Sequence, residues 1–177
     1  MINYNKFKRN TDKIKEKIWN LSTDFRDGLI DEFIQVIMDL LNISEVQEMK
    51  EYIHHGDKTL FDHSIHVAYF NFLFAKFFGL DIKSATRAGL LHDLFLYDWH
   101  DHFRETGNMF HGITHPAVSL KNANRICKLN KKEKNIILSH MWPLTLHYIP
   151  RCKEAYLTTV VDKVVSVFEK VDQVVRK

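Results

Sequence analysis

The chain has 177 residues, of which 45% are hydrophobic and 27% charged, with a formal net charge of +3. These values are typical of one globular domain that buries about 70% of its unfolded surface. The charge is too small to indicate a nucleic-acid polymer as partner, and no apolar stretch is long enough to span a bilayer. Two separated cysteines and the lack of an apolar N-terminal signal segment predict a cytoplasmic protein. Oligomeric state stays open.

The N-terminal third of the chain is predicted to be helical. Residues 1–21 carry many lysines and a few spaced apolar side chains, which indicates a solvated amphipathic helix. Apolar residues recur with a 3.6-residue period over 25–41, which predicts a second helix. Ser44 and Gln47 have the spacing of a capping box, so we expect a short helix to begin there and run to about residue 53.

The next segment predicts the central helix of the protein. Residues 54–58 are polar and are interpreted as a loop. Thr59 and Asp62 have the spacing of a capping box for a helix that starts near residue 60 and ends at residue 78. Gly79 fits the position just after its end. Because this helix is apolar nearly all round, we expect it to be buried on most sides.

A second central helix is predicted to follow. Asp81 is its expected cap, and the apolar pattern continues to about Leu96. Ala85, Ala88 and Gly89 form a stripe of small residues on one side. Such a stripe lets a neighbouring helix approach closely.

Three further elements complete the prediction. Residues 97–114 show no period and are interpreted as a long loop over a site. His115 is expected at the N-cap of a helix that continues to about residue 129, with Pro116 at its first position. Asn130 and Glu133 are expected to cap a helix that runs to about His140, and an irregular link follows. The valine-rich segment 155–171 favours a strand by propensity, but its length favours a helix.

Six side chains in these predicted elements have the chemistry of metal ligands: His63, His92, Asp93, His115, His140 and Asp162. An aspartate inside an apolar run needs a partner, and a metal ion is a simple one. Imidazole and carboxylate together favour iron, manganese, cobalt, nickel or zinc over magnesium or calcium. Six ligands are too many for one catalytic ion that keeps open positions, so they indicate two ions bridged by Asp93. Two close ions suit the displacement of a phosphoryl group.

The same residues resemble a known superfamily. The matching segments are HSIHVA at 63–68, LLHD at 90–93, THPAVS at 114–119, Ser-His at 139–140 and VVDKV at 160–164. The series H…HD…H…H…D is similar to that of the HD-domain metal-dependent phosphohydrolases. The resemblance covers about residues 54–170. It implies an all-α, single-domain HD-fold helical bundle over 1–177, with residues 1–53 as N-terminal helices that pack on it.

The resemblance implies a metal-bridging hydroxide that cleaves a phosphate ester or anhydride, with a small anionic nucleotide or dinucleotide as substrate. Iron or manganese is the first expectation for the two divalent ions, and zinc, nickel or cobalt stay open. The predicted ligands of metal one are His63, His92, Asp93 and Asp162, and those of metal two are Asp93, His115 and His140.

Several other residues have candidate roles around this centre. Asp98 is the predicted leaving-group acid because it is the nearest candidate to Asp93 in sequence, and a solvated loop residue is the alternative. His66 and Arg87 are predicted to bind substrate, with structural roles as alternatives. His54 and His55 are interpreted as surface histidines of a polar loop, with a role in catalysis as the alternative.

Departures from the family pattern leave the substrate open. Leu96 stands where many relatives have the lysine of HDxGK, and Thr59 stands where cyclic-nucleotide phosphodiesterases have a proton-donating histidine. The chain also lacks the paired histidines and the GYP motif of the cyclic-di-GMP group. The overall order is similar to that of HD-type dinucleoside-tetraphosphate hydrolases. A di-iron HD-fold oxygenase and a non-catalytic metal-binding regulatory module are the alternative functions.

Overall fold

Two adjacent helices, α4 (Leu60–Phe78) and α5 (Ile82–Leu91), form the centre of the fold. The computed structural model describes residues 23–55, 58–98 and 111–175. Within these residues the protein is all-α except for one short antiparallel hairpin, which confirms the predicted fold class. The other elements are α2 (Thr23–Leu41), α3 (Ser44–Glu48), the 3₁₀ turn η1 (Met49–Glu51), β1 (Ile53–His55), β2 (Lys58–Thr59), α7 (His111–Ile126), α8 (Lys131–Ser139) and α9 (Lys153–Val175).

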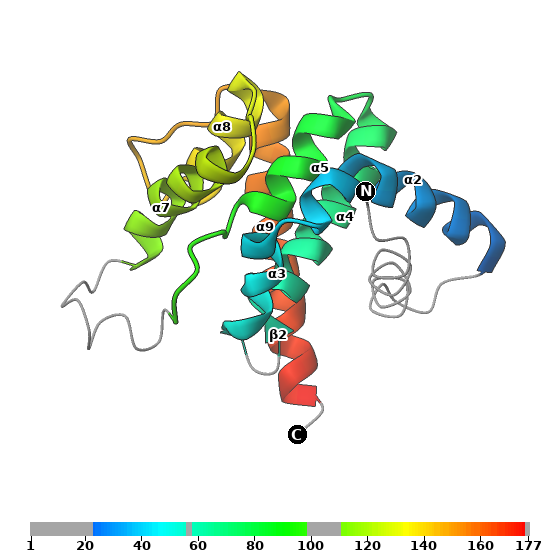
Figure 1. Ribbon diagram of the computed structural model, residues 1–177, viewed down its shortest axis with the longest axis horizontal. Helices are drawn as coiled ribbons and strands as arrows, with labels where there is room; N and C mark the ends of the chain where they lie inside the picture. Colours follow the sequence, from blue (N-terminus) through cyan, green and yellow to red (C-terminus); the bar gives the residue numbers. More distant parts are fainter. Residues whose placement is uncertain (1–22, 56–57, 99–110, 176–177) are drawn as a thin grey trace.

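The helices pack so that distant parts of the sequence meet. Helix α9 contacts both α4 and α8, and α5 contacts α2, α8 and α9. Figure 1 shows α7 and α8 on one side of the central pair and α2 on the other. No helix in the described part of the chain combines the length and apolarity needed to cross a membrane. The contacts among α4, α5, α8 and α9 join these four helices into one packed group.

Local hydrogen bonds fix both ends of α4 as predicted. The Thr59 side chain accepts a hydrogen bond from the Asp62 backbone N–H, and the Asp62 carboxylate accepts one from the Thr59 N–H. Gly79 follows the helix with a φ of 63°, a conformation that glycine adopts without steric cost. The capping box predicted at Asn130 and Glu133 is also present, at the start of α8.

The close approach of α4 and α5 depends on Gly89. A Cβ atom at this position would lie 2.7 Å from Asn71 Nδ2 and 3.0 Å from Ala68 Cα. The same Asn71 amide donates hydrogen bonds to the Ala85 carbonyl at 3.1 Å and to Thr158 Oγ1 at 2.9 Å. These bonds tie α4 to both α5 and α9. The predicted role of the small-residue stripe is therefore confirmed.

Helix α5 is shorter than predicted. It ends at Leu91, and His92 is its C-cap, whereas the apolar pattern suggested an end near Leu96. The chain turns at this point because the Phe95 N–H donates to the Asp93 carbonyl and Leu96 takes a φ of 52°. Apolar side chains continue past the helix end because they enter the core. The apolar pattern alone did not distinguish these buried residues after the helix from a continuation of the helix. The His-Asp pair consequently lies at a helix end.

Helix α7 begins earlier than predicted, at His111. His115 is therefore inside the helix rather than at its N-cap, and Pro116 follows it inside the helix. Proline lacks a backbone N–H, so Pro116 cannot donate the intrahelical hydrogen bond to the carbonyl four residues earlier. Of the predicted loop 97–114, residues 99–110 lie outside the described residues, as does the helix predicted over 1–21.

Three smaller segments complete the comparison with the sequence. The capping box predicted at Ser44 is wrong: Ile43 is the N-cap of α3, and Ser44 Oγ donates to the adjacent Glu45 carboxylate. The segment interpreted as a loop before α4 contributes to the hairpin of β1 and β2. The valine-rich C-terminal segment is helix α9, as its length indicated.

Candidate metal centre

The six predicted ligands converge at the point where α4, α5, α7, α8 and α9 meet. His63 comes from the first turn of α4, and Asp162 comes from the middle of α9. All six are buried, with at most 7% of each residue exposed. Overlapping groups of three from this set hold their nitrogen and oxygen atoms within 4.8 Å of one another. The described residues thus contain a buried histidine and aspartate cluster suited to a divalent metal.

Asp93 divides the histidines of the cluster into two pairs. Its Oδ2 atom lies 4.0 Å from His63 Nε2 and 3.4 Å from His92 Nε2. Its Oδ1 atom lies 3.2 Å from His115 Nε2 and 3.4 Å from His140 Nε2. Because each carboxylate oxygen faces a different pair, the side chain has the geometry of a bridging ligand.

Asp162 completes the first of these two groups. Its Oδ1 atom is 3.1 Å from His63 Nε2 and 3.5 Å from His92 Nε2. Burial alone would raise the pKa of this carboxyl, but the hydrogen bond with His63 and the close contact with His92 hold its pKa well below the usual range. Asp162 is therefore an anion at neutral pH and is available to a cation.

The four histidines all turn the same ring nitrogen toward the centre. Nδ1 of His92 donates to the Gly89 carbonyl, that of His115 to the His111 carbonyl, and that of His140 to the Ile137 carbonyl, at 2.7, 2.9 and 2.7 Å. A carbonyl can only accept, so each Nδ1 carries a hydrogen, and in the neutral ring Nε2 keeps its lone pair. This is the tautomer that a metal requires from Nε2.

The fourth histidine is oriented by a carboxylate that the sequence reasoning missed. Nδ1 of His63 lies 2.9 Å from Glu169 Oε2, and Nδ1 of His66 lies 2.8 Å from Glu169 Oε1. Burial would raise the pKa of Glu169, but these two hydrogen bonds lower it below its usual range. Glu169 follows Asp162 by two helical turns on α9, and this spacing was the available signal.

Glu169→Gln is expected to weaken metal binding by about 10–100-fold, because the charged acceptor that orients His63 is lost. Isothermal titration of the metal-free protein with Zn²⁺ measures the effect. Glu32→Gln is the control, since Glu32 forms an exposed ion pair with Lys76 on the far side of α4. An unchanged affinity in Glu169→Gln, with unchanged thermal stability, would contradict this role.

The charges of the cluster fit a cation. Burial would lower the pKa of His63, but its bonds to Asp162 and Glu169 raise it to about 10. Without a cation the ring therefore holds a proton at Nε2, which a metal ion would displace. His92 Nε2 and Asp93 Oδ1 are buried and make no hydrogen bond of good geometry among the described residues. Buried polar atoms are normally satisfied, and an ion between these atoms would satisfy both.

Arg87 forms ion pairs with two carboxylates from other helices. Its guanidinium is buried, donates from Nε to Glu133 at 3.0 Å and from Nη1 to the Asp39 carboxylate, and joins α5 to α8 and α2. A cation with two carboxylate partners has little capacity left for a phosphate. The placement of Arg87 argues against the predicted substrate contact and supports the alternative of an ion pair, here a buried one.

The other two predicted residues are His66, which shares Glu169 with the cluster, and Asp98. His66 has 24% of its side chain exposed and is held by Glu169, a position that leaves one ring edge accessible. Asp98 is exposed and follows the end of α5, adjoining residues outside the described part of the chain. Its role as a leaving-group acid stays a prediction.

Tyr97 and His111 lie beside the second histidine pair. A hydrogen bond of 3.0 Å joins the Tyr97 hydroxyl and His111 Nδ1, and the His111 ring stacks on His115 with centroids 4.7 Å apart. Burial, followed by the charge of Asp93, raises the pKa of Tyr97 to about 12. Tyr97 is consequently a neutral hydrogen-bonding group near the centre.

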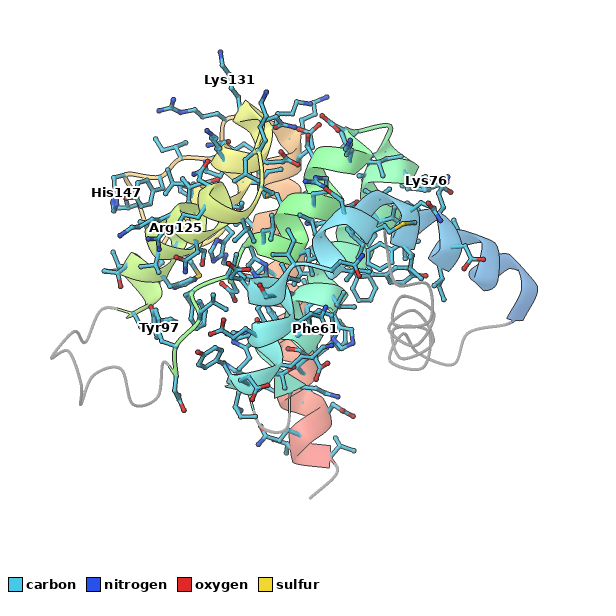
Figure 2. The ribbon with its side chains drawn as sticks, viewed as in Figure 1. Phe61, Lys76, Tyr97, Arg125, Lys131 and His147 are labelled. Carbon is cyan, nitrogen blue, oxygen red and sulfur yellow. The ribbon has the colours of Figure 1, made fainter. Side chains whose placement is uncertain are left out.

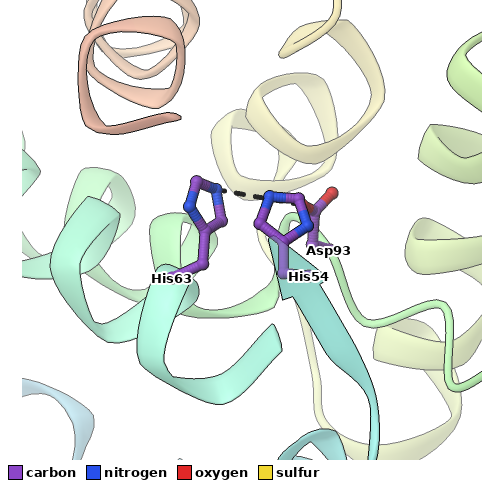
Figure 3. Close-up of side chains that lie close together, drawn as sticks. All are labelled: His54, His63 and Asp93. Carbon is purple, nitrogen blue, oxygen red and sulfur yellow. Dashed lines mark ion pairs between the residues drawn. The ribbon is translucent and has the colours of Figure 1, made fainter. Parts of the chain in front are cut away.

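His54 also lies beside the cluster, which the interpretation as a surface loop residue did not foresee. Its ring centroid is 4.1 Å from that of His63, and one of its nitrogens groups with donor atoms of His63 and Asp93 (Figure 3).

Comparison with known proteins identifies the family. A family model described as the HD domain matches residues 60–166, which include all six clustered ligands. Neither the curated proteins nor the solved structures contain a significant match. The matched segment covers more than half of the chain, and it carries the buried histidine and aspartate cluster in the expected order. The chain therefore belongs to the HD domain family.

Proposed function

We propose that this protein is a phosphohydrolase that uses two divalent transition-metal ions to cleave a phosphate ester or anhydride. The division of the four histidines by the two oxygens of Asp93 carries the proposal. One ion would be held by His63, His92, Asp162 and Asp93, and the other by His115, His140 and Asp93. Membership of the HD domain family, a superfamily of metal-dependent phosphohydrolase type, supports this reaction class.

Two such ions, when bound, would lower the pKa of a shared water and neutralise the oxygens of a phosphoryl group. The residues of the chain have the task of holding them apart and in place. Backbone carbonyls fix the rings of His92, His115 and His140 through Nδ1, so each Nε2 keeps one direction. The shared Asp93 carboxylate sets the separation of the two positions. Iron or manganese is the first expectation, with zinc, nickel or cobalt as alternatives.

The proposed substrate is a small anionic molecule, such as a nucleotide or dinucleotide. Arg87 is committed to Asp39 and Glu133, and Leu96 stands where many relatives have a lysine. The ions would therefore provide most of the positive charge that meets the phosphate. Tyr97 and His66 lie near the cluster and carry side chains that form hydrogen bonds.

Elemental analysis of protein purified without air, chelator or added metal tests the proposal. We expect two ions per chain, and a screen of mononucleotides and dinucleoside polyphosphates that finds metal-dependent release of a phosphate group. Removal of the ions by a chelator should abolish this activity, and adding them back should restore it. A chain that neither contains nor takes up metal would contradict the proposal.

The same protein preparation separates the alternatives. Consumption of oxygen together with a mixed-valent iron signal in electron paramagnetic resonance would assign the centre to an oxygenase. Two bound ions without turnover of any phosphate ester or of oxygen would assign it to a regulatory module.

A further inference from the structure

His54 is placed at the metal centre by the hairpin that precedes α4. Residue pairing in the hairpin joins Ile53 to Thr59, and Thr59 is the N-cap of α4. The Leu60 N–H donates to the Tyr52 carbonyl at 2.9 Å, which holds the start of α4 against the chain before β1. The start of α4, which carries His63, is therefore joined directly to β1, the strand that carries His54.

The ring of His54 lies close to the donor atoms of His63 and Asp93, which belong to the first proposed metal position. The His54 and His63 rings have centroids 4.1 Å apart and an interplanar angle of 46°. Donor atoms of His54, His63 and Asp93 all lie within 4.8 Å of one another, and both ring nitrogens of His54 are buried. Figure 3 shows the His54 ring reaching from β1 to a place between His63 and Asp93.

We infer that His54 is a further ligand of the ion held by His63 and Asp93. The inference rests on the proposed two-metal centre and adds a ligand that the HD series itself does not contain. Metal bonds of about 2.1 Å place two donors on one ion at most about 4.2 Å apart. The distances between the three donor atoms need to shorten by less than about 1 Å to meet this condition. Small movements of the side chains toward a bound ion would supply this change.

The added ligand makes the two metal positions unequal. The first ion has five protein donors, from His54, His63, His92, Asp93 and Asp162. The second ion has three donors, from Asp93, His115 and His140, and therefore keeps more open positions. An octahedral ion in the first position has one position left, so a phosphate oxygen of the substrate enters mainly at the second ion.

Titration of the metal-free full chain with Co²⁺, followed by visible absorption, tests this inference. His54→Gln keeps a similar size but is a much poorer ligand, and we expect it to weaken the tighter site by at least about tenfold and to change its absorption band. His147→Gln is the matched control, because His147 is exposed at the outer edge of the molecule (Figure 2). It should leave both the affinity and the band unchanged.

Nuclear magnetic resonance of the wild-type chain with ¹⁵N-labelled histidine gives a second readout that does not depend on the variant folding. On addition of Zn²⁺, a ring nitrogen of His54 should move into the range of metal-bound imidazole together with one from each of the four HD histidines. If two ions bind but the His54 nitrogens do not move, or if His54→Gln binds Co²⁺ like the wild type, the inference is overturned and the two-metal proposal stands. If the wild type binds no ion, both are overturned.

Discussion

Asp93→Ala is expected to abolish binding of the second metal ion, to weaken binding of the first and, as a result, to abolish hydrolysis. The two oxygens of Asp93 face the His63 and His92 pair and the His115 and His140 pair, so one substitution removes a ligand from each position. The second position then retains only two histidines. Loss of ions that supply several kcal/mol of transition-state stabilisation corresponds to roughly a 10³-fold loss of rate or more.

Two further variants show that the loss comes from the ligand itself. Asp93→Asn keeps the shape and one oxygen but removes the negative charge, and we expect it to retain at most one ion. Asp31→Ala removes an exposed carboxylate from α2 and should keep two ions and full activity. Metal content by elemental analysis and phosphate release are measured on all three, with circular dichroism to confirm folding. Two ions or full activity in Asp93→Ala would show that the proposed mechanism is wrong.

Helix ends were predictable where their hydrogen bonds are local. The caps of α4 and α8 join residues three apart, so the sequence contains both partners within one turn. The prediction at Ser44 had the same spacing, but there the Gln47 side chain donates to the Leu41 carbonyl of the preceding helix. The difference is a contact outside the predicted helix, which spacing within it does not reveal.

The candidate site was predictable as a set of residues but not in its supporting contacts. Each of the six ligands stands in a recognisable local segment, and their order carries the family signal. Glu169 bonds to His63 across 106 positions, and the contact requires the crossing of α4 and α9. Arg87 likewise takes its partners from α2 and α8. The sequence of α5 alone does not show these partners, so solvent or substrate was the expected neighbour of Arg87. Long-range packing therefore decided the residues that were missed or misassigned.

Gly89→Ala is expected to destabilise the protein by about 1–3 kcal/mol and to weaken metal binding as well. The new Cβ would lie 2.7 Å from Asn71 Nδ2 and 3.0 Å from Ala68 Cα, so α4 and α5 must separate. Separation strains the buried bonds from Asn71 to α5 and α9. It also moves the Gly89 carbonyl, which accepts the 2.7 Å hydrogen bond that orients His92.

Gly28→Ala is the same chemical change, but we expect it to stabilise the protein instead of destabilising it. Gly28 lies in α2, and a Cβ there would meet no atom of the described residues within 4 Å. Alanine in an open helical position stabilises by about 0.5–1 kcal/mol relative to glycine, because it restricts the unfolded chain. Thermal unfolding of the metal-free variants should therefore shift the melting temperature in opposite directions, by about 2–4 °C per kcal/mol. A gain in stability for both variants would mean that α4 and α5 do not need a glycine to meet, and that His92 reaches the metal centre without their close contact.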